Sequence, residues 1–276
     1  MPEIAQIGII SRLQGEATDD SLPRYYPADG WLDRDTLFLF DAGKTASWPS
    51  QADPANGASV INLVEGGSVS TVLKTGANIT FRENGFSLPG LGNNFIRAAT
   101  ATQYELAEMG NPDVLYIIWI KRETGYSTAS YQCVIGRGSN TVAGNYEFYI
   151  NLGPAGDQPG FAFSTSSLNV SRVLTGAPLT SFQGALLNTT VQLAVAQEGG
   201  RTKAFLNGVL AAETDVLFTK PYNNINSDMY IGNGVGGNAG KFLVKRWGMT
   251  KLTTKTAAER VLQDYTMNVA RMTATD

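Results

Sequence analysis

The sequence predicts an all-β protein: an antiparallel, two-sheet jelly-roll sandwich with an N-terminal arm and a C-terminal helix. Apolar or alternating segments of strand length recur along the chain, separated by clusters of Gly, Asn, Pro and Asp, which is typical of antiparallel β-domains. The 276 residues include 30 glycines and 11 prolines, which suits a fold with many turns. The segments are too numerous for one sheet, and two stacked sheets bury alternate residues of each strand.

Residues 1–35 read as an arm or lead-in. Pro, Asp and Gly give this stretch turn chemistry, and its aromatic residues Tyr25, Tyr26 and Trp31 need cover. These rings pack either on the body of the chain or on a neighbouring subunit, and the sequence does not separate the two. We treat residues 36–276 as one sandwich domain.

The predicted strands follow in order from residue 37. They are 37–40, 60–64, 70–74, 78–81, 95–98, 114–122, 131–136, 146–152, 160–164, 170–174, 190–197, 202–206, 209–213, 229–231 and 241–249.

Two of these segments also indicate their place in a sheet. Residues 114–120 are apolar on both faces, which predicts a central strand covered on each side. In residues 190–197, Val191, Leu193 and Val195 share one face, with Gln192 and Ala194 opposite. That alternation predicts a half-buried strand.

A hairpin is predicted at Asn207-Gly208, between two short apolar runs. Both central residues of a type I′ turn need positive φ, which Asn and Gly tolerate best. The strands on either side should therefore be adjacent and antiparallel.

The one convincing helix is expected at residues 257–271. Thr256 and Glu259 fit a capping box, in which the Thr side chain caps the helix and the Glu side chain reaches back. An apolar stripe should dock this helix on the sandwich. Its residues are Ala258, Val261, Leu262, Tyr265 and Val269.

Charge and hydropathy exclude several functions. The net charge of −3 and scattered Lys and Arg residues give no basic surface for phosphate backbones, so nucleic-acid binding is not expected. No apolar run approaches the roughly 18 to 20 residues that span a bilayer, and the N-terminus resembles no secretory signal.

Histidine is absent and Cys133 is the single cysteine. Catalysis by Ser-His-Asp or Cys-His groups, histidine metal sites and internal disulfides are thereby excluded. Cys133 lies in a predicted strand, where a buried structural thiol is expected.

The last third of the chain carries a family resemblance. The runs FLNG at 205–208, IG at 231–232, GKF at 240–242 and the helix segment at 257–265 resemble the laminin-G-like members of the concanavalin A-like lectin and glucanase superfamily. Residues 186–265 match well, and the upstream match is weaker. The resemblance implies a concanavalin A-like jelly roll, but this superfamily includes lectins, hydrolases, adhesion modules and viral structural proteins, so fold does not fix function.

Glycoside hydrolysis is the third-ranked interpretation of this resemblance. The β-glucan hydrolases of the superfamily carry Glu-x-Asp-x-x-Glu on a strand, whereas this chain has Glu213, Asp215 and then Phe218. Retaining chemistry needs a close carboxylate pair, so we expect no enzyme here. The other acidic candidates lack the family spacing; they are Glu105, Glu108, Asp113, Glu123 and Glu147.

Calcium is the one metal that the sequence suggests, and no other cofactor is expected. Asn224, Asn226 and Asp228 offer oxygen ligands at short spacing, as calcium requires. The alternative is that they form Asx-turns that satisfy backbone N–H groups, and the single carboxylate favours this second interpretation.

Carbohydrate binding would use exposed aromatic rings in or near loops. The candidates are Trp48, Tyr126 and Tyr222, although aromatic residues more often fill sandwich cores.

We therefore expect a non-enzymatic structural or adhesion component of a bacteriophage virion: a tail, fibre, baseplate or capsid-surface protein. Its partners would be other virion proteins or further copies of itself, with a host cell-surface glycan as a second class of partner. The alternative is a carbohydrate-binding receptor-recognition module outside a virion.

Overall fold

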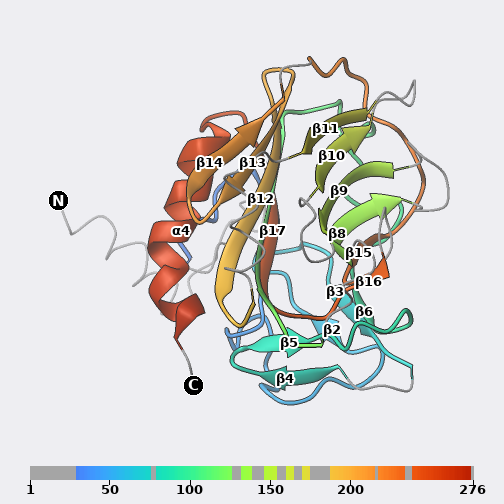
Figure 1. Ribbon diagram of the computed structural model, residues 1–276, viewed down its shortest axis with the longest axis vertical. Coiled ribbons are helices and arrows are strands. Elements are labelled where there is room, and N and C mark those ends of the chain that lie inside the picture. Colours follow the sequence, from blue (N-terminus) through green and yellow to red (C-terminus); the bar gives the residue numbers. More distant parts are fainter. Residues whose placement is uncertain are drawn as a thin grey trace, which may run out of the picture.

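In the described residues, the chain forms two stacked β-sheets with a C-terminal helix packed against the outside (Figure 1). The computed structural model describes residues 29–75, 79–125, 132–138, 146–153, 160–164, 170–174, 187–214, 217–233 and 238–274. Tyr25 and Tyr26 of the predicted arm and Tyr126 of the predicted sugar site lie outside these residues.

Sheet 1 has eight strands. In spatial order they are β14 (Val209–Glu213), β13 (Arg201–Leu206), β12 (Thr190–Glu198), β7 (Val114–Arg122), β17 (Phe242–Lys251), β5 (Gly85–Ser87) and β4 (Thr80–Arg82), with β1 (Thr36–Asp41) also pairing with β17.

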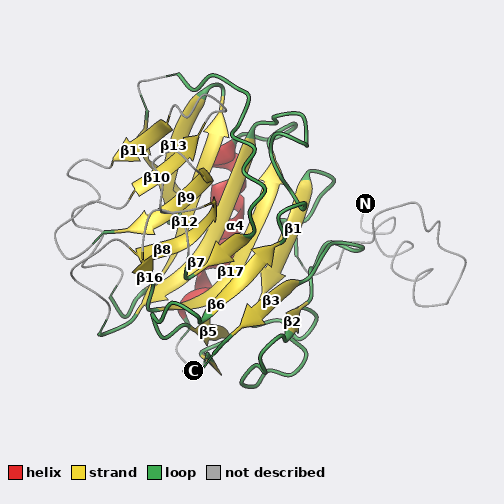
Figure 2. Cartoon of the chain, turned by 90° about the vertical axis from the view of Figure 1, so that its right-hand side faces the viewer, coloured by secondary structure: helices red, strands yellow, loops and turns green. Residues whose placement is uncertain are grey.

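Sheet 2 has nine strands. They run β11 (Val170–Leu174), β10 (Gly160–Ser164), β9 (Tyr146–Leu152), β8 (Gln132–Gly138), β15 (Met229–Ile231), β6 (Phe95–Ala99), β3 (Ser70–Leu73) and β2 (Ser59–Val60), with β16 (Asn238–Ala239) pairing in parallel with β8. All other strand pairs in both sheets are antiparallel. The predicted antiparallel sandwich is confirmed (Figure 2).

The main core fills the space between the sheets. Tyr116 of β7 stacks on Phe148 of β9 with ring centroids 3.7 Å apart, and Phe40 stacks on Trp247 at 5.3 Å. Aromatic pairs of this kind bury large apolar areas. The Tyr116–Phe148 pair joins sheet 1 to sheet 2, whereas Phe40 and Trp247 are cross-strand neighbours within sheet 1.

Strand β7 lies between β12 and β17, so the predicted central position of residues 114–120 is confirmed. The alternation in β12 is confirmed as well. Val191, Leu193 and Val195 face the main core, whereas Ala194 packs in a second apolar cluster on the other side of sheet 1. Gln192 on that side donates to Asp264 of the helix at 2.8 Å.

Strand β2 is shorter than predicted, and β5 and β16 were not predicted. The Asn62 side-chain oxygen accepts hydrogen bonds from the backbone N–H groups of Leu39 and Val64, both at 3.0 Å. These bonds replace ladder partners and end the strand at Val60.

Helix α4 (Ala257–Thr273) covers the outer face of sheet 1. Thr256 and Glu259 form the predicted capping box. The predicted docking stripe was wrong in part, because Leu262 is 53% exposed and Ala258 is exposed. The buried face of the helix is Ala257, Arg260, Val261, Asp264, Asn268 and Met272.

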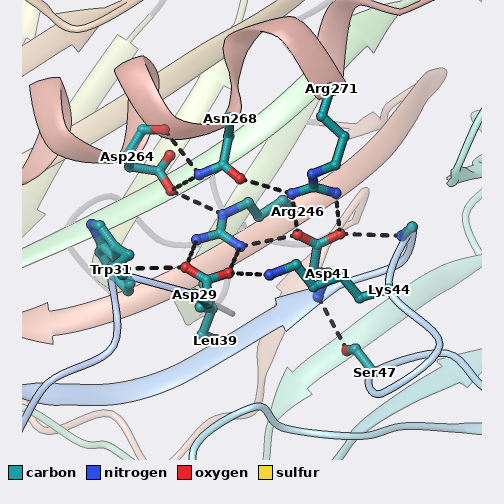
Figure 3. A network of polar contacts seen from close by, with 12 residues as sticks. Asp29, Trp31, Leu39, Asp41, Lys44, Ser47, Arg246, Asp264, Asn268 and Arg271 are labelled. Carbon is teal, nitrogen blue, oxygen red and sulfur yellow. Dashed lines mark hydrogen bonds and ion pairs between the residues drawn. The ribbon is translucent and has the colours of Figure 1, made fainter. Parts of the chain in front are cut away.

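The helix is rotated toward these polar residues because they meet charged groups on the sheet. Arg246 of β17 is fully buried and contacts Asp29, Asp41 and Asp264 at 2.6, 3.0 and 2.9 Å (Figure 3). We call these four residues the Arg246 cluster. A buried charge needs paired, hydrogen-bonded partners, and Asp264 reaches Arg246 only when α4 turns this face to the sheet.

Two further cations balance the Arg246 cluster. Lys44 donates to Asp29 at 2.8 Å, and Arg271 donates to Asp41 at 2.9 Å. Burial raises the pKa of Asp29, but Arg246 and Lys44 outweigh it and hold this pKa well below its usual range. Asp29 therefore stays ionised under all mild conditions.

The lead-in also packs on the body of its own chain where it is described. Trp31 is fully buried, and its indole N–H donates to the Arg260 carbonyl at 3.3 Å. The Arg260 side chain donates to the Trp31 carbonyl at 2.9 Å. Residues 29–35 are therefore fixed to α4.

Candidate functional site

A half-exposed aromatic and charged cluster lies on the outer face of sheet 2, away from the core. Strands β6 and β15 are neighbours, and Tyr230 pairs with Arg97. Ile96 and Ile231 point into the core, so alternation turns Phe95, Arg97 and Tyr230 outward. We call Phe95, Arg97, Asp228 and Tyr230 the outer-face cluster.

The cluster combines a ring pair with a donor and an acceptor. The Phe95 and Tyr230 rings meet edge to face at 5.0 Å. The Tyr230 hydroxyl donates to Asp228 Oδ2 at 3.2 Å, and Arg97 Nη1 lies 3.7 Å from the same oxygen. The Arg97 and Asp228 side chains are 34% and 23% exposed, so both remain accessible to a ligand.

The electrostatics keep Tyr230 neutral. Partial burial and the nearby Asp228 carboxylate raise the pKa of Tyr230. The phenol therefore keeps its proton at physiological pH and acts as a hydrogen-bond donor.

Asp228 is fixed from its other side by the loop at residues 100–111. The backbone N–H of Ala101 donates to Asp228 Oδ1 at 2.8 Å. The carboxylate is thereby held between this loop and Tyr230, and its orientation is set before any ligand arrives.

A buried arginine supports both loops beneath the cluster. Arg137 Nη1 donates to the carbonyl oxygens of Thr100, Ala101 and Ser227 at 3.3, 3.1 and 3.0 Å, and Nη2 donates to the Gln103 carbonyl. Arg137 is fully buried. One side chain thus joins the 100–111 loop to the 221–228 loop.

Glu147 lies beside Arg137 because of a β-bulge. Arg137 pairs with Phe148 and Gly138 pairs with Tyr146, which leaves Glu147 as the extra residue that the bulge turns inward. Glu147 Oε1 accepts from the Leu106 N–H at 3.3 Å. Burial raises the pKa of Glu147 to about 8, so this side chain is largely protonated at neutral pH.

The calcium candidates bond to different partners. Asn224 donates to Glu108 at 3.0 Å, and the Asn226 backbone N–H donates to Glu105 at 3.4 Å. Asp228 belongs to the outer-face cluster. These hydrogen bonds tie the 221–228 loop to the 100–111 loop. The described residues contain no group of three or more acidic or Cys side chains placed to hold a metal ion.

Two predicted sugar-binding rings lie in the core, and their assignment as sugar contacts is corrected here. Trp48 is 5% exposed and meets Phe86 at 5.1 Å. Tyr222 is 1% exposed, and its hydroxyl donates to the Pro112 carbonyl at 2.9 Å. Core packing, the alternative interpretation, describes both rings, since neither offers a face to a sugar.

The acidic residues considered for hydrolysis have structural partners. Asp113 pairs with Lys220 at 2.7 Å, and Glu213 pairs with Arg201 at 3.4 Å. Asp215 lies outside the described residues. Cys133 is buried, as predicted.

Sequence reasoning missed Phe95, Arg97 and Tyr230. The alternation of Phe95-Ile96-Arg97 and of Met229-Tyr230-Ile231 places these side chains opposite the core-facing residues. The pairing of two strands so far apart in the sequence carries no comparable signal.

The described residues form a two-sheet antiparallel β-sandwich that carries a partly exposed aromatic and charged cluster on the outer face of sheet 2. No protein-family model matches the chain, and no curated protein matches it. In the described part of the chain, no helix has the length and apolar character needed to cross a bilayer.

Solved structures share the fold at low sequence identity. The sialidase of Trypanosoma rangeli matches with a TM-score of 0.56 and 9% identity, over 99% of this chain and 40% of that one. The botulinum neurotoxin serotype D binding domain matches with a TM-score of 0.55 and 12% identity, over 84% and 51%. The type G receptor-binding domain matches with a TM-score of 0.54 and 12% identity, over 85% and 51%. This chain therefore spans about half or less of each of these longer chains.

Proposed function

We propose that the chain is a non-enzymatic attachment module whose outer-face cluster binds a cell-surface glycan. The cluster is the observation that carries this proposal. A sugar ring presents C–H groups on one face and hydroxyl groups at its edge, so its binding site needs an apolar ring surface beside fixed polar groups. Phe95 and Tyr230 supply the ring surface, and Arg97 and Asp228 supply the polar groups.

The loops that support the outer-face cluster are already fixed in place, which favours a role in binding over a role in a conformational change. Arg137 and Glu147 hold the 100–111 loop from within the core, so the cluster is ordered before ligand arrives. Pre-organisation lowers the entropy cost of association.

We further propose that the module is a component of a bacteriophage particle, with the lead-in directed toward the particle. Residues 29–35 are fixed to α4 on the outer face of sheet 1, and the cluster lies on the outer face of sheet 2. A chain attached through its lead-in would present the cluster on the opposite side. The receptor-binding domains among the structural neighbours agree with an attachment role by analogy of fold alone.

A glycan array with the full chain tests the glycan part. We expect binding by the wild type and at least a tenfold loss in Tyr230→Ala. The matched control is Tyr265→Ala, which removes another half-buried ring, stacked on Trp119 under α4. The proposal would be contradicted if the wild type bound none of the printed glycans, or if the two variants lost the same amount of glycan binding.

The particle assignment has a separate test. Bacteriophage particles whose genome encodes this chain would be purified by density gradient and their proteins identified by mass spectrometry. We expect this chain in fixed ratio to capsid or tail proteins, and recovery only as a free protein would refute the assignment.

A further inference from the structure

We infer that the outer-face cluster selects an uncharged, hydroxyl-rich sugar over an acidic one. This inference rests on the proposed glycan binding and adds the chemical class of the ligand.

The first step is the pairing of a donor with an acceptor. Arg97 Nη1 and Asp228 Oδ2 are 3.7 Å apart, which is too long for a hydrogen bond. Arginine only donates, and an ionised carboxylate only accepts. Neighbouring sugar hydroxyls can do both, so one hydroxyl can donate to Asp228 while the next accepts from Arg97.

The second step is the capacity that remains on Asp228. An ionised carboxylate has about four acceptor positions. Ala101 N–H and the Tyr230 hydroxyl use one on each oxygen. Asp228 therefore has acceptor positions left for a ligand hydroxyl, and its two bonds prevent it from turning away.

The third step is the local charge. Within the outer-face cluster, the positive charge of Arg97 and the negative charge of Asp228 cancel each other. The loops at 100–111 and 221–228 add Glu105 and Glu108 and contain no Lys or Arg in their sequence, while Arg137 is buried beneath them. A carboxylate approaching Arg97 would meet a fixed Asp228 next to it, and like charges at this range repel.

The fourth step is the ring surface. Phe95 and Tyr230 meet edge to face and are both half-buried. Such a surface suits the C–H face of a sugar and gives no attraction to an anion, because an aromatic face carries partial negative charge.

The experiment uses the full chain and a printed panel of neutral oligosaccharides, each paired with the same oligosaccharide carrying a terminal carboxylated sugar. We expect the neutral members to bind at least tenfold more tightly than their acidic partners. We also expect this affinity to change by less than twofold between about 50 and 500 mM NaCl, since screening removes only charge–charge attraction.

Two variants assign the selectivity to the cluster. Asp228→Asn keeps an oxygen that can accept from the Ala101 N–H, but it loses the negative charge. The affinity for neutral glycans should therefore fall about tenfold, and the discrimination against acidic glycans should become smaller. Arg97→Gln should weaken neutral binding without creating affinity for acidic glycans. If Asp228→Asn discriminates against acidic glycans as strongly as the wild type does, and Arg97→Gln binds neutral glycans as tightly as the wild type does, then the selectivity arises elsewhere and the inference is overturned.

The outcomes for the wild type separate the two claims. A preference for acidic glycans that depends on Tyr230 and disappears in high salt would overturn the inference and leave the attachment proposal standing. Absence of binding to both members of every pair would overturn both.

Discussion

Arg246 Nε and Asp264 Oδ1 lie 2.9 Å apart, and both side chains are completely buried. This ion pair joins β17, a central strand of sheet 1, to helix α4, which covers that sheet. It also explains why α4 buries a polar face and leaves Leu262 in solvent, because the charge on Arg246 requires carboxylates around it.

Replacing Arg246 should be severely destabilising. Arg246→Met leaves Asp29, Asp41 and Asp264 without their shared cation. We expect a loss of about 3–5 kcal/mol in the free energy of unfolding, as for other buried pairs broken from one side. Urea denaturation at pH 7 would measure it.

Arg271→Gln is the matched control for this loss. Arg271 also contacts Asp41, but its side chain is 35% exposed, so its removal should cost about 1 kcal/mol or less. Equal losses in the two variants would show that burial is not the cause.

Glu147 predicts a fall in stability as the pH rises from about 4.5 to about 8. Its pKa is raised from 4.5 to about 8 in the folded state by burial, so the folded chain binds a proton that the unfolded chain releases. This contribution is complete below pH 4.5 and is lost as the pH rises through 8, with a slope of roughly 1.4 kcal/mol per pH unit.

The slope would be measured by urea denaturation between pH 5 and 9, with Glu147→Gln in parallel. The amide cannot titrate, so the variant should lose this part of the slope. Identical slopes in both proteins would contradict the assignment to Glu147.

Gly208 predicts a specific cost of adding a methyl group. It has φ of +84°, and a Cβ there would lie 3.1 Å from the Tyr265 ring. Gly208→Ala should therefore lose about 1–2 kcal/mol for the backbone conformation and more for the contact.

Gly57→Ala separates the two terms. Gly57 has φ of +79°, but nothing lies within 4 Å of a Cβ at that position. Its thermal unfolding should reflect the backbone cost alone, and a shift as large as that of Gly208→Ala would rule out a role for Tyr265.

Neighbouring helix residues should respond differently to truncation. Val261 is fully buried and Leu262 is 53% exposed. We expect Val261→Ala to cost about 2 kcal/mol and Leu262→Ala to change stability by less than about 0.5 kcal/mol. The denaturant midpoints of the two variants compare these losses directly. A larger loss in Leu262→Ala than in Val261→Ala would support the apolar docking stripe that the sequence predicts.

The sandwich was predictable because each strand carries its own signal. Residues 114–122, 146–152 and 209–213 begin and end as predicted, since alternation and turn residues act locally. Strand β5 has only three residues, too few for a periodic pattern.

The orientation of α4 was not predictable from hydrophobicity. Asp264 and Asn268 look like solvent-facing residues until Arg246 is known to be buried behind them. A buried charge is a tertiary fact, and it reverses the meaning of polar positions on a helix.

The outer-face cluster also depends on pairing between distant segments. Phe95 and Arg97 precede Tyr230 by about half the chain, and only the assembled sheet brings them together. Trp48 and Tyr222 fit the composition of a sugar site equally well, but the structure uses them as core aromatics.

The Arg246 cluster also sets an order of assembly. Asp29 and Arg246 are separated by 217 positions along the chain, so their contact closes a loop that contains nearly both sheets. Closing so long a loop is slow, and the contact stabilises the chain only after the intervening strands have paired. We expect Arg246→Met to accelerate unfolding and leave the refolding rate nearly unchanged in stopped-flow experiments, and slower refolding would show that the cluster forms early. During synthesis, the lead-in would wait for almost the entire chain to emerge before finding its partner.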